Sequence, residues 1–467
     1  MADRTKAIRF CIVGAGAAGL AVAKNFRQRG IPFDCFERET DIGGLWNADT
    51  PSGVVYDSAH MVSSRDMTAF DDFPMPDDYP IYPSHRQAMA YLRSYAEKFR
   101  ILENIQLGAA VEHIEESDGG WDLRIAGETQ PRHYDGVVIA NGHHDEPRWP
   151  DYPGDFAGTL LHSRDYRSPS QLAGKRVLVV GAGNSACDIV NDAIHHADEV
   201  MLSIRRGYYI VRKYTFGLPT DKVVNMFEAM RLPRWLRQWL YVLAHRIVTG
   251  SARRYGLPMP KYWILDTHPT LNSELPSHVG HGRVEVKPDI DSFAGSKVKF
   301  VDGSEAEPEL VVFATGYRIS FPFIDDKLLL GPQGNPKLFL NVFHPDKDNL
   351  FAAGLIQANG SIWRLADYQA QLISSFIVAK ARDSEQARWF CGLKSAGDRA
   401  GHRGRYVASE RHMLEHDYYA YGRALRKLVR KFGEMARAPY PDPLAETAPE
   451  DRRAQELASS GQRRHAA

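Results

Sequence analysis

Two glycine-rich turns in this 467-residue chain have the residue types and spacing that bind the phosphates of a dinucleotide. In the first, Gly14, Gly16 and Gly19 follow the spacing GxGxxG. The first glycine permits a tight turn, the second lets a pyrophosphate approach the backbone, and the third allows close helix packing. An apolar segment, residues 7–13, precedes the turn, and an amphipathic segment that Gly30 ends follows it. This pattern predicts a strand, a turn and a helix whose N-terminus binds phosphate.

The residues at the end of the next strand distinguish the two nucleotides. After the first turn, the strand PFDCFE ends in Glu37, whose carboxylate can accept hydrogen bonds from ribose hydroxyls. The second turn, residues 181–186, precedes the strand EVMLSI and then Arg205 and Arg206. Two guanidinium groups can bind a 2′-phosphate that a carboxylate would repel, so we predict NADP(H) at the second turn. The alternative is that both arginines are simply solvated at a strand end.

Two dinucleotide sites in one chain indicate a flavin in the first and a nicotinamide in the second, with hydride transfer between them. Such strand-turn-helix units predict an α/β fold. The chain is longer than a typical core of about 100–200 residues, so we expect two or three domains.

Charge and cysteine content argue against several classes of protein. The 58 basic and 58 acidic residues balance, which provides no long-range attraction for nucleic acid. The four cysteines are far apart and form no CxxC pair, so we expect neither a metal site nor a disulfide framework. The N-terminus lacks the apolar run of a signal peptide, and no run of about 18 apolar residues occurs. We therefore expect a cytoplasmic protein without a transmembrane segment.

The segment FAGTLLHSRDY, residues 156–166, resembles the pattern FxGxxxHxxxY/F of the flavin-containing monooxygenases, through Phe156, Gly158, His162 and Tyr166. Baeyer–Villiger relatives carry Trp where this chain has Tyr166. Other segments that resemble family signatures are GGLW (43–46), DFPMPDDYP (72–80), FATGY (313–317) and GLIQANGSIW (354–363). In the family, the 156–166 segment is a linker between domains, and its histidine is thought to help control cofactor geometry.

The resemblance implies two Rossmann-like domains, with an NADP-binding domain inserted into an FAD-binding domain. The expected bounds are 1–155 for the first part of the FAD domain, 156–312 for the NADP domain, and 313–440 for the second part with a C-terminal helix. Residues 441–467 are rich in Pro, Ala and charge and are predicted to be disordered. A helical insertion is predicted at about 208–285.

Within the insertion, the periodicity of residues 231–256 predicts an amphipathic helix. Its apolar face comprises Trp235, Leu236, Trp239, Leu240, Leu243 and Ile247, and the surrounding arginines are Arg234, Arg237, Arg246, Arg253 and Arg254. This face fits packing over the substrate cleft or against a second copy in a homodimer. Contact with a membrane surface is the alternative, because tryptophans and basic residues suit that interface.

The resemblance also supplies the expected cofactor contacts. They are Gly14, Gly16, Ala17, Ala18, Gly19, Glu37, Arg38, Gly44, Leu45, Trp46, Val62, Ser63, Gly181, Gly183, Asn184, Ser185, Ala186, Cys187, Asp188, Arg205, Arg206, Thr315, Gly316 and Gln357. No acid–base dyad or nucleophilic triad is required, so Ser63, Ser64 and His162 are the only candidates for a catalytic role, and His162 is expected to organise the site. The segment HPTLNSELP, residues 268–276, resembles a family stretch near the cleft, but Asn272 and Glu274 could equally cap a helix.

The resemblance implies that NADPH reduces FAD and that reduced flavin reacts with dioxygen to a C4a-hydroperoxide, which can transfer oxygen to an amine or sulfide. One position departs from the family. Many members have an asparagine three residues before a Lys/Arg-Glu/Asp-Met stretch, whereas Val62 stands here before Arg65, Asp66 and Met67. Either Ser63 or Ser64 replaces the lost hydrogen bond, or the intermediate is shorter-lived and releases more hydrogen peroxide.

The leading hypothesis is therefore an NADPH- and O₂-dependent monooxygenase that oxygenates nitrogen or sulfur in a small lipophilic substrate. A second hypothesis is attack on a carbonyl, by Baeyer–Villiger insertion or oxidative decarboxylation of a 2-oxo acid. Tyr166 argues against the former, and Val62 keeps the latter open. A third hypothesis is an NADPH flavoprotein reductase or oxidase that does not oxygenate, since the fold alone permits it.

Overall fold

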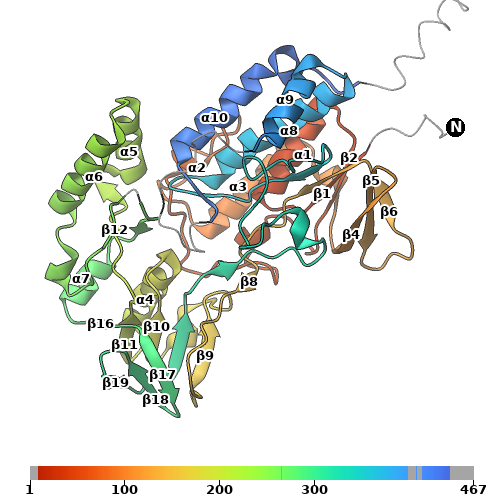
Figure 1. Ribbon diagram of the computed structural model, residues 1–467. Helices are drawn as coiled ribbons and strands as arrows, with labels where there is room; N and C mark the ends of the chain where they lie inside the picture. Colours follow the sequence, from red (N-terminus) through yellow and green to blue (C-terminus); the bar gives the residue numbers. More distant parts are fainter. Residues whose placement is uncertain (1–8, 265, 398–405, 407–412, 442–467) are drawn as a thin grey trace, which may run out of the picture.

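Two five-stranded parallel sheets organise the chain, and each has a glycine turn directly after its central strand (Figure 1). The computed structural model describes residues 9–264, 266–397, 406 and 413–441. The predicted disordered tail, 441–467, lies outside the described residues from 442 onward.

The first sheet has the strand order β22-β7-β1-β2-β3, and every neighbouring pair is parallel. Its strands are β1 (Phe10–Val13), β2 (Phe33–Phe36), β3 (Ile105–Gln106), β7 (Gly136–Ile139) and β22 (Leu350–Ala352). The four residues of β1 are all buried, as expected for a strand covered on both faces. This sheet and the elements packed on it are the first unit.

The second sheet repeats this arrangement with the order β16-β11-β10-β20-β9, again all parallel. Its strands are β9 (Thr159–His162), β10 (Arg176–Val180), β11 (Glu199–Ser203), β16 (Glu285–Lys287) and β20 (Leu310–Phe313). We call it, with its packed elements, the second unit. Two Rossmann-like units, with the second inserted between β7 and β22 of the first, confirm the predicted fold class.

Each sheet packs a helix on one face and a three-stranded antiparallel sheet on the other. In the first unit, α1 (Ala17–Arg29) covers the face of Phe10 and Ile12, and the sheet of β4 (Val111–Ser117), β5 (Gly120–Ile125) and β6 (Arg132–Tyr134) covers the opposite face. In the second unit, these places are taken by α4 (Asn184–His196) and by β17 (Ile290–Ala294), β18 (Lys297–Phe300) and β19 (Glu305–Ala306). The alternation of side chains along each central strand divides them between the two cores.

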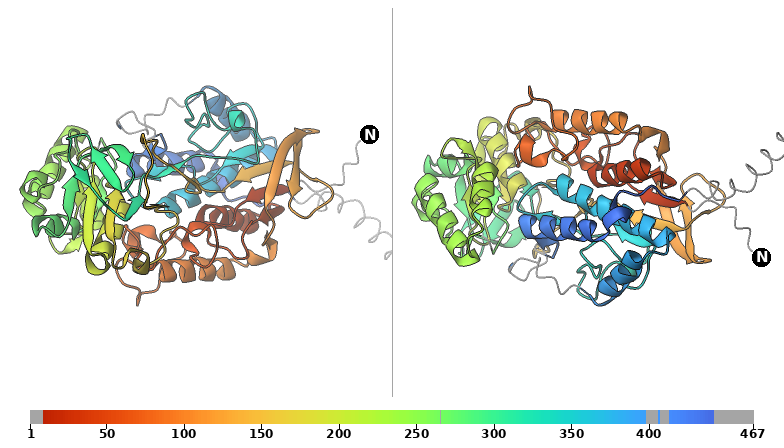
Figure 2. Two further views of the ribbon diagram at one scale, coloured as in Figure 1. Left: turned by 90° about the horizontal axis from the view of Figure 1, so that it is seen from below. Right: turned by 90° about the horizontal axis from the view of Figure 1, so that it is seen from above.

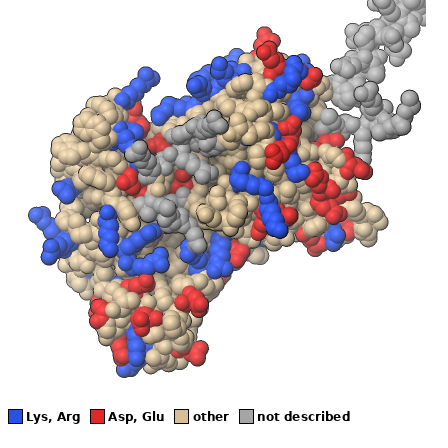
Figure 3. Space-filling view, viewed as in Figure 1, with Lys and Arg blue, Asp and Glu red and all other residues tan. Residues whose placement is uncertain are grey.

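Further helices complete the first unit (Figures 1 and 2). They are α2 (Arg65–Thr68), α3 (His85–Lys98), α8 (Ile362–Ala381), α9 (Glu385–Ser395) and α10 (Tyr418–Lys431), with the short pair β23 (Gln357–Ala358) and β24 (Glu415–His416). Of these helices, α3 and α8 pack on α1, and α2, α9 and α10 pack on α8. α3 begins with a capping box, in which Ser84 and Gln87 each bind the other's backbone N–H. Basic side chains gather over α10, and acidic ones gather over β4–β6 (Figure 3).

The segment expected to link the domains is partly a strand. Residues 159–162 form β9, an edge strand of the second sheet that pairs with β20, so His162 lies opposite Phe313. Phe313 therefore still belongs to the second sheet, one residue beyond the expected bound of that domain. The two crossings between units are made by β8 (Glu146–Pro147) and β21 (Tyr317–Arg318), which pair antiparallel.

The predicted helical insertion forms one end of the molecule, opposite β4–β6 (Figures 1 and 2). It contains α5 (Thr220–Ala229), α6 (Arg234–Val248), α7 (Leu275–Gly280) and the short strands β12 (Ile210–Val211), β13 (Tyr214–Thr215), β14 (Leu218–Pro219) and β15 (Thr270–Leu271).

The apolar stripe of α6 does not pack over the cleft in the described chain, whereas its packing against a second copy or a membrane surface stays a prediction. Trp235, Trp239 and Ile247 are 69%, 54% and 65% exposed, and Tyr241 alone is buried in this helix. Side chains four residues apart lie on one stripe of the helix, and that stripe faces away from the rest of the described chain. Among the described residues, no helix is both long and apolar enough to span a bilayer.

Candidate functional site

The first glycine of each turn is required by the protein's own backbone. Gly14 and Gly181 have φ of +100° and +130°, which side chains of L residues rarely adopt. A Cβ on Gly14 would lie 2.7 Å from the carbonyl oxygen of Ala140, and one on Gly181 would lie 2.5 Å from that of Ala314. Ala140 directly follows β7 and Ala314 directly follows β20, so the two turns are built in the same way.

The second glycine of each turn leaves a space that the protein does not fill. A Cβ on Gly16 would meet only the Cα of Gly44, at 3.8 Å, and one on Gly183 would meet no atom within 4 Å. Both glycines are helix N-caps with almost the same φ and ψ, −72° and −178° for Gly16 and −80° and −179° for Gly183. Neither helix has a side-chain cap, so the N–H groups of its first turn can bind a phosphate. Both turns therefore fit the pyrophosphate of a dinucleotide.

Glu37 directly follows β2 and binds the first turn itself. Its Oε2 accepts a hydrogen bond from the N–H of Ala15 at 2.7 Å, and its Oε1 accepts one from the N–H of Glu39 at 3.0 Å. Burial raises the pKa of the Glu37 carboxyl, and the two N–H donors oppose that shift. The residue expected to bind a ribose thus also holds the glycine turn in shape.

The signature residues Gly44, Leu45 and Trp46 lie against the first turn. A Cβ on Gly44 would approach the Cα of Gly16 to 3.2 Å, and the N–H of Gly43 donates to the carbonyl of Ala15 at 3.0 Å. From the second part of the first unit, a Cβ on Gly354 would meet the Cβ of Ala18 at 2.7 Å. Three separate segments therefore come close together around the first turn, and Gly44 and Gly354 allow their close approach.

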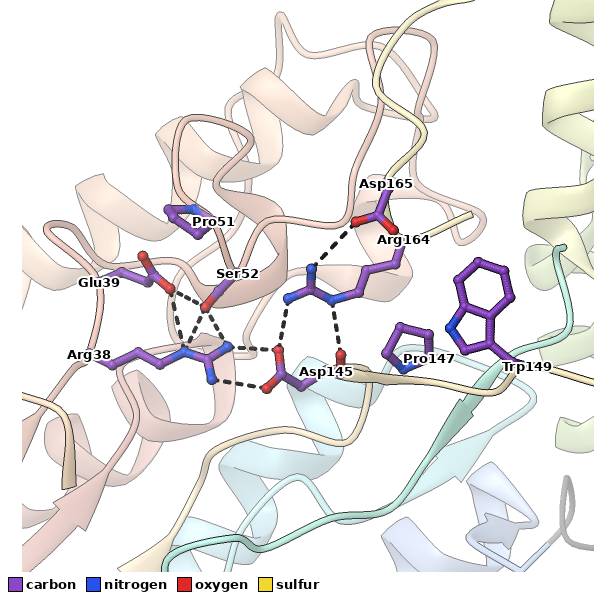
Figure 4. A pocket seen from close by; sticks show the side chains of 9 residues that line it. All are labelled: Arg38, Glu39, Pro51, Ser52, Asp145, Pro147, Trp149, Arg164 and Asp165. Carbon is purple, nitrogen blue, oxygen red and sulfur yellow. Dashed lines mark hydrogen bonds and ion pairs between the residues drawn. The ribbon is translucent and has the colours of Figure 1, made fainter. Parts of the chain in front are cut away.

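Arg38, another expected cofactor contact, is held by an acidic partner between the units (Figure 4). Its guanidinium makes two hydrogen bonds to the carboxylate of Asp145, at 2.9 and 2.7 Å, and Arg164 reaches the same carboxylate at 3.2 Å. The hydrogen bond from Arg38 lowers the pKa of Asp145. These side chains line a cavity of about 300 Å³ whose walls are Arg38, Glu39, Pro51, Ser52, Asp145, Pro147, Trp149, Arg164 and Asp165.

His162 is buried among aromatic rings where the two crossings meet. Its ring lies 5.5 Å from that of Trp149 and 5.4 Å from that of Tyr317, measured between centroids. Its Nδ1 accepts a hydrogen bond from the N–H of Arg164 at 3.1 Å, and burial lowers its pKa. A neutral ring in this position suits packing and orientation better than proton transfer.

The loop that carries Val62 meets the insertion. Val62 and Ser63 are half-buried, and Ser64 is 1% exposed with an Oγ that has no hydrogen-bond partner among the described residues. Asp221, in the first turn of α5, accepts the N–H of Ser64 on its Oδ2 at 2.6 Å. Its Oδ1 is buried and also lacks a partner in the described part of the chain. Sequence reasoning missed Asp221, because no local pattern relates positions 157 residues apart.

The residues that open α4 have different roles from one another. Cys187 is fully buried in the core of the second unit, so its expected contact with a nucleotide, which stays a prediction, would be made by its backbone. The Oδ1 of Asn184 accepts the N–H of Leu271 at 2.9 Å and ties the turn to the insertion. Asp188 accepts hydrogen bonds from Tyr56 at 2.8 Å and from Asn272 at 3.4 Å, and burial raises its pKa to about 6.

Asn272 is a helix cap, as one of the two sequence interpretations expected. Its Oδ1 accepts the N–H groups of Glu274 and Leu275, at 2.9 and 2.8 Å, at the start of α7. Glu274 contributes only its backbone N–H to this cap.

Arg205 and Arg206 follow β11, at the sheet edge where the second turn lies. The N–H of Gly181 donates to the carbonyl of Ser203 at 3.0 Å, which brings the turn beside the end of this strand. Arg205 is exposed, whereas Arg206 donates from Nε to the hydroxyl of Tyr208 at 3.0 Å. Arg205 is thus the better placed of the two to bind an incoming phosphate.

The remaining expected contacts lie where the chain returns to the first unit. The hydroxyl of Thr315 donates to the carbonyl of Arg148 at 2.6 Å, and the N–H of Arg148 donates to the carbonyl of Gly316 at 3.0 Å. These bonds join the two crossings. Gln357 is half-buried in β23.

Comparison with known proteins agrees with this geometry. The family model described as flavin-binding monooxygenase-like matches residues 7–444. Flavin-containing monooxygenase 5 of Oryctolagus cuniculus is 32% identical over 439 residues, which cover 88% of this chain and 80% of that protein. Dimethylaniline monooxygenase [N-oxide-forming] 2 of Rattus norvegicus is 35% identical over 389 residues, 78% of this chain and 72% of that protein. The structure of S-allyl-L-cysteine S-oxygenase from Allium sativum, 21% identical, superposes with a TM-score of 0.61 and covers 90% of this chain and 88% of that one.

Proposed function

Because this chain belongs to the flavin-binding monooxygenase-like family and is a flavin-dependent monooxygenase that uses FAD and NADPH, we propose that it oxygenates a nitrogen or sulfur atom of a small lipophilic substrate. The observation that carries the choice of nitrogen is the 35% identity to an N-oxide-forming dimethylaniline monooxygenase. Tyr166 supports it, since Baeyer–Villiger relatives carry Trp at that place in the motif.

When bound, FAD supplies the chemistry, which is to accept a hydride and to activate dioxygen for transfer. In the proposed arrangement, Gly14, Gly16 and Gly44 surround the pyrophosphate of FAD, and Glu37 accepts hydrogen bonds from its ribose. The first turn of α1 directs its N–H groups and the positive end of its dipole toward the phosphates.

At the second turn, Gly183 and the first turn of α4 bind the pyrophosphate of NADPH, and Arg205 binds the 2′-phosphate. The rings of Trp149 and Tyr317 pack on His162 between the two units. Burial lowers the pKa of neighbouring His144 to about 4, so both histidine rings are neutral at pH 7 and supply no proton that would hasten the loss of activated oxygen as hydrogen peroxide.

Ser64 and Asp221 supply the polar atoms near Val62. The Ser64 hydroxyl can donate the hydrogen bond that an asparagine at position 62 would otherwise offer, and Asp221 holds the Ser64 backbone in place. The loop, closed by α5 of the insertion, therefore orients the reacting groups and excludes water.

The test is product analysis with the FAD-loaded protein, NADPH and air. N,N-dimethylaniline, methyl phenyl sulfide, cyclohexanone and phenylpyruvate serve as one matched panel. We expect an N-oxide or a sulfoxide, with NADPH consumed in proportion. A lactone or a decarboxylated acid as the main product would favour the carbonyl-attack alternative, which Val62 keeps open. NADPH oxidation that yields only hydrogen peroxide with the whole panel would contradict the proposal.

A further inference from the structure

A short loop of the first unit, residues 54–59, packs on α4 of the second unit, directly behind the second glycine turn. Val55, Tyr56 and Ala59 belong to the apolar core of the second unit, together with Ile189 and Val190 of α4. The backbone N–H of Asp57 in the loop donates to the carbonyl of Arg167 at 2.9 Å. A segment that belongs by sequence to the first unit is therefore part of the core of the second.

Three hydroxyl groups meet two carboxylates at this contact. Asp188 and Asp192 lie four residues apart on one face of α4. The hydroxyl of Tyr56 donates to Asp188 at 2.8 Å, and that of Ser58 donates to Oδ2 of Asp192 at 2.6 Å. The hydroxyl of Tyr166 donates to the same oxygen of Asp192 at 2.8 Å. We call Tyr56, Ser58, Tyr166, Asp188 and Asp192 the hydroxyl clasp.

The two tyrosines of the clasp are buried, whereas Ser58, Asp188 and Asp192 are half-buried. Tyr166 is completely buried, Tyr56 is 7% exposed, and the centroids of their rings lie 5.4 Å apart. Hydrogen bonds from a hydroxyl to a carboxylate are stronger than those between neutral groups, and they are directional. A phenylalanine would fill the same apolar space, so the hydroxyls contribute orientation in addition to packing. The motif accepts Tyr or Phe at position 166, and only a chain with Tyr there can make the bond to Asp192.

The residues of the clasp are close in sequence to both nucleotide sites. Asp188 is five residues beyond Gly183, within the first turns of α4. The loop that ends at Ala59 continues directly to Val62, Ser63 and Ser64. A shift of α4 against this loop would change the distance between the NADP(H) turn and the residues proposed to lie beside the flavin.

We propose that the hydroxyl clasp sets the position of the NADP(H) site relative to the flavin site, so that Tyr56, Ser58 and Tyr166 are positioning residues for hydride transfer. The proposal rests on the cofactors of the proposed function and not on its substrate. Hydride transfer depends steeply on the separation and angle of donor and acceptor, and a displacement of about 1 Å can slow a reaction by as much as 100-fold.

The first experiment measures geometry without cofactor. Spin labels are placed at exposed sites in the two units through Lys98→Cys and Lys297→Cys, in a background with Cys391→Ser, and their distance distribution is recorded by pulsed electron paramagnetic resonance. Tyr56→Phe and Tyr166→Phe each remove one hydroxyl and are expected to broaden or shift the distribution. Tyr134→Phe is the matched control, because it removes a buried tyrosine–carboxylate bond, 2.7 Å to Asp34, that lies wholly within the first unit.

The second experiment follows anaerobic reduction of the bound flavin by NADPH in the same variants and in Ser58→Ala. We expect the limiting reduction rate to fall by about tenfold in the clasp variants, while the dissociation constant of NADP⁺ stays within about twofold of the wild-type value. Tyr134→Phe should leave both quantities unchanged. Distance distributions and limiting rates that match the wild type in all three clasp variants would overturn the proposal, and so would an equal fall in Tyr134→Phe. Neither readout involves the oxygenated substrate, so failure of the N- or S-oxygenation proposal would be seen separately.

Discussion

The carboxylate of Asp221, in the insertion, accepts the backbone N–H of Ser64, in the loop beside the proposed flavin site, at 2.6 Å. The second oxygen of this carboxylate and the hydroxyl of Ser64 are both buried without a partner among the described residues. An insertion distant in sequence thus contacts the loop through this bond. In the proposed function, its role is to hold the loop and to keep water out.

Asp221→Ala should therefore increase the leak of reducing equivalents. Without the carboxylate, the N–H of Ser64 loses its partner and water can reach the loop, so we expect the fraction of NADPH recovered as hydrogen peroxide to rise severalfold. Peroxide and NADPH measured together provide the check. Lys222→Ala is the neighbouring control. Its ion pair with Asp66 at 2.6 Å is exposed and contributes about 0–1 kcal/mol, so coupling should change little. Equal leakage in the two variants would contradict this role for Asp221.

Alanine substitutions at the second turn should separate folding from binding. At Gly183 a Cβ meets no atom, so Gly183→Ala should unfold at nearly the wild-type temperature but bind NADP⁺ poorly, because the new methyl group occupies the phosphate site. At Gly181 the backbone has φ of +130° and the Cβ would meet the carbonyl of Ala314, so Gly181→Ala should cost about 1–3 kcal/mol of stability. Thermal unfolding of the apoprotein and calorimetric titration with NADP⁺ measure the two effects. Normal NADP⁺ affinity in Gly183→Ala would show that the nucleotide lies elsewhere.

Arg205→Ala should reduce the preference for NADPH. A charge-assisted bond to the 2′-phosphate contributes about 1.5–3 kcal/mol, so kcat/KM for NADPH is expected to fall by about 10- to 100-fold while that for NADH stays constant. Initial rates with both nucleotides measure this. Arg253→Ala, which removes an exposed arginine of the insertion, is the control. A wild-type enzyme that used NADH as well as NADPH would refute the assignment.

The ionisation of Asp188 should make the free energy of unfolding of the protein depend on pH. Burial raises its pKa to about 6 from 3.8, so the folded state holds this proton more tightly than the unfolded state. The associated stability is fully present below about pH 4 and is lost as the pH rises through about 6, by at most about 3 kcal/mol. The asparagine in Asp188→Asn cannot ionise, so the variant does not lose this stability as the pH rises. Its free energy of unfolding minus that of the wild type should therefore be larger at pH 7 than at pH 5. Urea unfolding of both proteins at the two pH values measures the difference. A constant difference would mean that Asp188 titrates normally.

Local patterns in the sequence were sufficient for the α/β class and for both glycine turns. A strand, a turn and a helix are formed by neighbouring residues, and Gly14, Gly16 and Gly181 are needed by the turn itself or by a phosphate against it. The resemblance to the flavin-containing monooxygenases implied that one unit is inserted into the other. The exchange of Glu37 for Arg205 at the strand ends likewise indicated the two different nucleotides before any contact was known.

Contacts between distant segments were decided only by the tertiary structure. Residues 159–162 were expected in a linker, yet they form β9 because β20, far along the chain, offers an unpaired edge. Cys187 was expected at a nucleotide, and only the packing of α4 shows that its side chain lies in the core, which leaves its backbone for that contact. The bonds of Tyr56 to Asp188 and of Ser64 to Asp221 join positions 132 and 157 residues apart. Periodicity and spacing report only on residues that are near one another in the sequence. These pairings follow from how whole elements pack, and that packing depends on the shape of every side chain between them.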